Sequence, residues 1–170
     1  RPAVEDLASR STLHAVTGHL IVRLSSCGLG DAALRSWATA QLLPQIEVFR
    51  GAGNAVRLAE LDLSHNEITD AGLAALFRVW GKSGAACPLL LKLHFNRLGD
   101  PALATLAAFV RAYRGQVREL HLTNNSFSSH EAVSGLLDSF AGLSQYPMWN
   151  RRQRRYAPVY LRLGQCGIPE

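Results

Sequence analysis

One short pattern recurs along this chain and constrains its fold more than any other feature. Each copy has two leucines separated by one residue, then two variable residues, an asparagine, one variable residue and an apolar residue. The three clearest copies begin at Leu61, Leu91 and Leu120, and their asparagines are Asn66, Asn96 and Asn125. A pattern that recurs at this interval predicts a stack of similar units, each packed against its neighbours.

Two further copies carry a cysteine in place of the asparagine. They begin at Val22 and Leu161, and the cysteines are Cys27 and Cys166. The copies resemble leucine-rich repeats, whose pattern accepts either residue at this position. The Ala- and Leu-rich segments that follow look like those of the long, ribonuclease-inhibitor-like type. The resemblance implies an α/β fold, a leucine-rich-repeat solenoid of about five repeats. It would be a curved right-handed stack with parallel strands on the concave face and helices on the convex face.

The residue types in each copy agree with that expectation. Alternating leucines predict a short strand with its leucines inward and the intervening residue outward. The turn after the strand has backbone groups without sheet partners, and a side-chain amide can both donate to them and accept from them. We therefore expect the three asparagines to form a buried column. Four residues beyond the ladder positions, aspartates are expected to cap the following helices; these are Asp31, Asp70 and Asp100.

The spacing of the ladder positions is not uniform. Positions 27, 66, 96, 125 and 166 are separated by 39, 30, 29 and 41 residues. The two long intervals hold insertions near 43–57 and 144–158, and such insertions often lie on the binding side of a repeat protein. We expect a single domain over residues 1–170, as part of a larger protein or assembly. Further sequence or a partner is expected to cover its C-terminal edge, because no polar capping unit follows the last copy.

The positive charge of the chain is concentrated in the second insertion. The formal net charge is +5, and it falls to +1 without the four arginines Arg151, Arg152, Arg154 and Arg155. Trp149 and Tyr156 flank them, and aromatic rings beside guanidinium groups are typical of surfaces that stack bases and bind phosphates. Three interpretations stay open for this segment. It is a solvated loop, an RNA contact, or a site for an acidic protein partner or a nuclear-import receptor.

The outward positions of the expected strands form the second candidate site. Mixed charge, imidazoles and an aromatic ring suit recognition of a protein partner. The candidate contacts are Arg23, Glu60, Asp62, Lys92, His94, Glu119, His121, Tyr160 and Arg162. Opposite charges on neighbouring strands can also pair with each other, which would leave a solvated face without a partner. The resemblance implies a protein–protein interaction scaffold that binds through the concave face. The alternative is an RNA-associated protein that uses residues 149–156.

Other classes of function lack support in the sequence. No nucleophile elbow, phosphate-binding glycine loop or other catalytic motif occurs, so we do not expect an enzyme. The histidines lack the spacing of a ligand set, so no metal and no cofactor are expected. No apolar run is long enough to span a membrane. The three cysteines show no disulfide pattern, which favours an intracellular location, cytoplasmic or nuclear.

Overall fold

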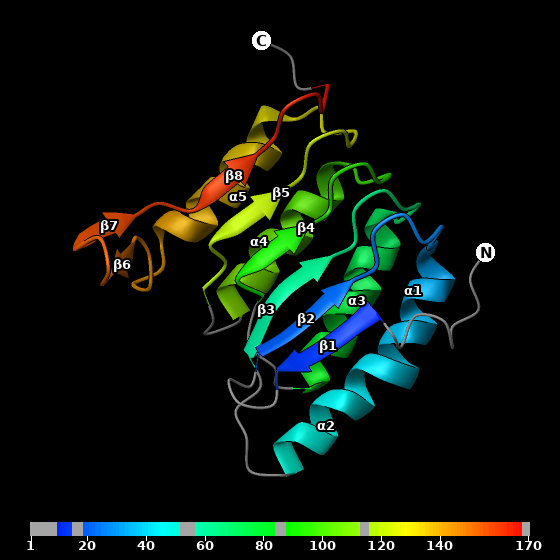
Figure 1. The fold of residues 1–170 in the computed structure, drawn as a ribbon. Coiled ribbons are helices and arrows are strands. Elements are labelled where there is room, and N and C mark those ends of the chain that lie inside the picture. Colours follow the sequence, from blue (N-terminus) through cyan, green and yellow to red (C-terminus); the bar gives the residue numbers. More distant parts are fainter. Residues whose placement is uncertain (1–9, 15–18, 52–56, 84–87, 113–115, 168–170) are drawn as a thin grey trace.

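A computed structural model describes residues 10–14, 19–51, 57–83, 88–112 and 116–167. Within these residues a six-stranded sheet carries helices on one side (Figure 1). The strands, in sheet order, are β1 Ser11–His14, β2 His19–Arg23, β3 Arg57–Asp62, β4 Leu90–Lys92, β5 Glu119–His121 and β8 Tyr160–Arg162. Strands β2, β3, β4, β5 and β8 run parallel, as the copies predict. Strand β1 pairs antiparallel with β2 and was not predicted from the sequence.

The helices connect successive parallel strands. They are α1 Asp31–Trp37, the π-helical turn η2 Ala38–Leu42, α2 Leu43–Gly51, α3 Asp70–Ser83, α4 Asp100–Ala112 and α5 His130–Ala141. Because α1, η2 and α2 are contiguous, the first insertion begins as a helical extension; its residues 52–56 lie outside the described residues. The second insertion forms an antiparallel hairpin of β6 Met148–Asn150 and β7 Arg155–Ala157. This hairpin lies near the start of β8, which is the edge strand of the sheet (Figure 1).

The core lies between the sheet and the helices. The paired leucines of the three central copies are fully buried there, as the alternation predicts; they are Leu61, Leu63, Leu91, Leu93, Leu120 and Leu122. Between helices, the ring of Phe77 in α3 stacks on Phe109 of α4, with centroids 3.9 Å apart. The last copy differs, because Leu161 and Leu163 are only half-buried. The sheet is therefore well covered in its centre and less so at β8.

The asparagines form the buried column expected from the pattern. The Asn66 amide donates to the carbonyls of Leu24 and Leu63 at 2.8 and 2.9 Å, while its oxygen accepts from the backbone N–H of Cys27 and Leu29. Asn96 and Asn125 repeat the two donor bonds one strand further along each time, and each of their oxygens accepts from one backbone N–H. The residue before each ladder position has left-handed backbone with φ between 53° and 56°; these are Ser26, His65, Phe95, Asn124 and Gln165. Five turns thus have a left-handed residue at the same position.

The three aspartates do not cap their own helices, so that prediction is wrong. Each is the first residue of its helix, and its carboxylate accepts hydrogen bonds from the next turn in the stack. Asp31 accepts from the backbone N–H and the hydroxyl of Thr69, at 2.9 and 2.6 Å. Asp70 accepts from Gly99 N, and Asp100 accepts from Ser128 N and Ser129 N. Stacking brings the free N–H groups before the next helix within reach of each carboxylate.

Candidate partner-binding face

The sheet surface opposite the helices, here called the open face, carries the predicted strand contacts. Strand pairing aligns Arg23, Asp62, Lys92, His121 and Arg162 in one row across the sheet. A second row holds Glu60, Leu90, Glu119 and Tyr160. These rows follow the spacing of the copies in the sequence, because equivalent positions of parallel strands stand side by side.

At the N-terminal half of the open face, four charged side chains bind one another. Lys92 Nζ lies 2.7 Å from Glu60 Oε1 and 3.2 Å from Asp62 Oδ2. A guanidinium nitrogen of Arg23 donates to Glu60 Oε2 at 2.9 Å. Asp62 also accepts from the hydroxyl of Ser64 at 2.6 Å. We call Arg23, Glu60, Asp62 and Lys92 the charged cluster. The members of the cluster bind one another. Arg23 is the exposed member, so it is the most accessible to a partner.

The cluster favours the charged forms of its members. Burial raises the pKa of Glu60, but hydrogen bonds and charge from Lys92 and Arg23 outweigh it, so this pKa lies below its ordinary value. Burial likewise raises the pKa of Asp62, and the bonds from Ser64 and the charge of Lys92 lower it further than burial raises it. The pKa of Lys92 is raised, because its two carboxylate partners outweigh the opposing effect of burial.

Three imidazoles lie next to the charged cluster. The ring centroids of His65 and His94 are 5.3 Å apart, and those of His94 and His121 are 6.1 Å apart. Burial, and the positive charges nearby, lower the pKa values of His94 and His121 below the ordinary value. In the part of the chain that the structure describes, no three His, Cys, Asp or Glu side chains are placed to hold a metal ion.

The C-terminal half of the open face is more exposed. The side chain of Tyr160 is 51% exposed, and the guanidinium of Arg162 lies over its ring, 5.0 Å from the centroid. His121 Nε2 lies 3.3 Å from Glu119 Oε2, and Glu119 is half-exposed. This end of the sheet therefore presents an aromatic ring, a cation and an acid together at the surface.

The hairpin brings the second predicted set of residues close to this end of the sheet. Trp149 and Tyr156 pair across β6 and β7, with ring centroids 5.0 Å apart. The four arginines Arg151, Arg152, Arg154 and Arg155 are all exposed. A cleft of about 480 Å³ lies between the hairpin and the strands, and its lining includes Arg118, Glu119, Trp149, Arg151, Pro158 and Tyr160. Two candidate sites that the sequence presents separately thus meet in one cleft.

Arg118 and Pro158 were not among the predicted site residues. Arg118 comes immediately before β5, next to the predicted contact Glu119, so the copy pattern could have indicated its place at the strand entrance. Pro158 follows the hairpin, and its position depends on how the insertion folds. The cleft does not include Arg152, Arg154 or Arg155, which belong to the outer part of the hairpin.

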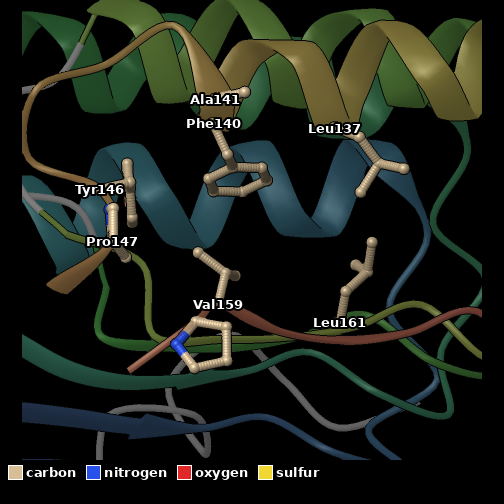
Figure 2. A pocket seen from close by; sticks show the side chains of 8 residues that line it. Leu137, Phe140, Ala141, Tyr146, Pro147, Val159 and Leu161 are labelled. Atoms are coloured by element: carbon tan, nitrogen blue, oxygen red, sulfur yellow. The ribbon is translucent and has the colours of Figure 1, made fainter. Parts of the chain in front are cut away.

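A second hollow lies on the helix side of β8. Its lining is almost entirely apolar and its volume is about 300 Å³. Figure 2 shows Leu137 and Phe140 of α5 above Val159 and Leu161, with Tyr146 and Pro147 at one end. Leu137 is 49% exposed here. The expectation that further sequence or a partner covers this edge stays a prediction.

The sequence of β3, its turn and the first part of α3 agrees with a known family. The family model described as Leucine Rich repeat matches residues 58–77. This match supports a leucine-rich repeat protein. The mixed α/β architecture with parallel strands fits such a fold. Comparison with curated proteins gave no match.

Leucine-rich repeat domains commonly mediate protein–protein interaction, and the family is typically non-enzymatic. The first property agrees with a face built from mixed charged and aromatic side chains. None of the described helices is long and apolar enough to cross a membrane.

Proposed function

We propose that this leucine-rich repeat protein is a protein–protein interaction scaffold of the long, ribonuclease-inhibitor-like type. About five repeats form its solenoid, and the open face is the concave face on which a protein partner docks. The observation that carries this proposal is the contact between the exposed Tyr160 ring and the Arg162 guanidinium on the surface of β8. Tyrosine and arginine are the residue types that contribute most binding energy at protein interfaces.

The proposal assigns different roles to the two halves of the open face. The charged cluster holds its side chains in fixed positions, so little conformational entropy is lost when a partner covers them. The C-terminal half supplies the exposed contacts, and Arg23 supplies one at the opposite end. Cys27 and Cys166 are buried free thiols, which suits a reducing intracellular compartment, cytoplasmic or nuclear.

Site-specific photocrosslinking tests the docking surface. A photoreactive amino acid replaces Arg162 on the open face in one variant and Arg111 in the last turn of α4 in a second. In extract from the source cells, the first variant should give a specific protein adduct that the second does not give. The affinity of the purified partner for the Arg162→Glu variant should then fall about tenfold or more, and for Arg111→Glu it should not change. Equal crosslinking from both positions would contradict open-face binding.

A second candidate function is contact with single-stranded RNA through the hairpin. The observation that favours it is the grouping of exposed Trp149 and Tyr156 with four exposed arginines. Fluorescence anisotropy with labelled oligouridylate over a salt series tests it. Four phosphate contacts predict a log–log slope of about −2.8, from about 0.7 per neutralised phosphate on a single strand. Binding should disappear when all four arginines become glutamate; no binding at low salt would exclude this candidate.

A further inference from the structure

We propose that the cleft between the hairpin and the entrance of β5 and β8 binds an acidic segment of a protein partner. An aromatic or apolar side chain of that segment would lie between Trp149 and Tyr160, with carboxylates on either side. The inference rests on the proposed protein-binding function and adds the chemistry of the bound segment.

The cleft is preformed because the hairpin is fixed to the start of β5. The backbone N–H of Val117 donates to the hydroxyl of Tyr146 at 2.8 Å, and the Gln116 side chain donates to the carbonyl of Gln145 at 2.9 Å. On the other wall, the N–H of Tyr160 donates to the carbonyl of Arg118 at 2.8 Å. A site whose walls are held in this way costs little ordering energy when a ligand binds.

The lining suits a single large side chain. Met148 is buried in it, and Ala157 and Pro158 add apolar surface. Trp149, 52% exposed, and Tyr160, 51% exposed, contribute aromatic side chains to the same lining. Exposed aromatic rings around a cleft bind aromatic and aliphatic side chains, since the contact removes apolar area from water on both partners.

The charges around this apolar lining favour carboxylates. Arg118 and Arg151 line the cleft, and among the described residues neither has an acidic partner. Arg162 lies beside Tyr160, and the remaining hairpin arginines add positive charge nearby. Glu119 is the one acid of the lining, and His121 lies within hydrogen-bond distance of it. Guanidinium groups bind carboxylates with two parallel hydrogen bonds, so unpaired arginines select acidic side chains.

Two features favour an acidic peptide over a nucleic acid in this cleft. The carboxylate of Glu119 belongs to the lining and would repel phosphates. Trp149 and Tyr156 meet edge to face, at an interplanar angle of 68°, so they do not form two parallel surfaces for successive bases. A peptide can donate backbone N–H groups to Glu119 while its carboxylates lie beside Arg118 and Arg151, and its side chains can use one ring at a time.

Fluorescence anisotropy with defined probes tests the inference. The probe is a short labelled peptide with a central tryptophan between aspartates. Matched probes replace the tryptophan with glycine, or the aspartates with lysines, and oligouridylate of equal charge is the fourth probe. We expect the acidic tryptophan peptide to bind most tightly, and affinity to fall about tenfold or more in Arg151→Glu and in Trp149→Ala. Arg111→Glu, which makes the same charge change on α4, should leave affinity unchanged.

Each alternative result has a distinct meaning. Tighter binding of oligouridylate would overturn the inference in favour of a nucleic-acid site. Equal affinity for the glycine peptide would exclude a pocket for an aromatic side chain. If no peptide binds while photocrosslinking at position 162 still captures a partner, the cleft inference fails and the proposed function stands. If neither is observed, both fail. All substituted side chains are exposed, and thermal unfolding by circular dichroism confirms that each variant is folded.

Discussion

Gly72 in α3 lies so close to the Asp31 carboxylate that a β-carbon at position 72 would collide with it. This carboxylate belongs to α1 and reaches toward α3, where it accepts two hydrogen bonds from Thr69. The glycine therefore makes room for a neighbouring side chain, and its backbone angle is not in the left-handed region. Gly135 in α5 offers a contrast, because nothing lies within 4 Å of the position that its β-carbon would take.

These two helical glycines should respond to alanine with opposite signs. Gly72→Ala should lower the free energy of unfolding by about 1–3 kcal/mol, since Asp31 must give up its hydrogen bonds to Thr69. Gly135→Ala should raise it by about 0.4–1 kcal/mol, because alanine restricts the unfolded chain without a clash. Urea unfolding followed by circular dichroism measures both. A stabilising Gly72→Ala would mean that the carboxylate moves aside at no cost.

The asparagine column should contribute strongly to stability. Asn96→Ala leaves the N–H of Ile68 without its acceptor and removes one of the two amide donors to each of the Leu63 and Leu93 carbonyls. We expect the free energy of unfolding to fall by about 1–3 kcal/mol. Ser134→Ala, at an exposed position of α5, is the control and should change it by less than about 0.5 kcal/mol. Similar values for the two variants would contradict the structural role of the column.

The charged cluster should make stability depend on acid pH. Since the folded pKa values of Glu60 and Asp62 lie below their unfolded values, their contribution is present above about pH 4 and is lost as pH falls through the folded values. Lys92→Met removes the cation that both carboxylates share. It should lower the free energy of unfolding by about 1–3 kcal/mol at pH 7 and flatten its loss between pH 5 and 3. An unchanged acid slope would show that Lys92 does not stabilise the two carboxylates.

His94 and His121 should add a second pH effect in a higher range. Their folded pKa values lie below the ordinary value, so the unfolded chain binds more protons as pH falls below about 6.5. Stability should therefore decrease between pH 7.5 and 5.5. The decrease should be smaller in a double variant with both histidines changed to glutamine, and it should persist in His130→Gln, an exposed control in α5. Chemical denaturation at the two pH values measures it.

Much of the sheet could be predicted from the spacing of the leucines. Equal offsets between copies place Lys92 beside Asp62 and His121, because parallel strands in a stack pair at equivalent positions. The same logic predicts the asparagine column. Strand β1 could not be found in this way, since the segment Ser11–His14 does not belong to a copy and pairs antiparallel with β2. Its pairing depends on tertiary contact rather than on a local pattern.

The candidate cleft was only partly predictable. Its residues Glu119 and Tyr160 occupy outward strand positions, and Trp149 and Arg151 belong to an insertion with unusual composition. The place of the insertion against the sheet could not be predicted, because β6 and β7 have three residues each, lack a long alternating pattern and form a separate two-stranded sheet. The hydrogen bond from Val117 N–H to the Tyr146 hydroxyl joins the segment before the hairpin to the start of β5, and the two residues are 29 positions apart.

The turns that follow the strands also determine how neighbouring strands of the sheet align. Intervals of 41 and 29 residues separate neighbouring ladder positions, yet β5 pairs with β8 in the same register as β4 with β5. The register of each strand therefore depends on the turn that follows it. It does not depend on the number of residues between two turns. The segment from Met148 to Ala157 is thus a site where another hairpin could be grafted. A hairpin of different length could replace it, and β5 and β8 would still pair in the same register.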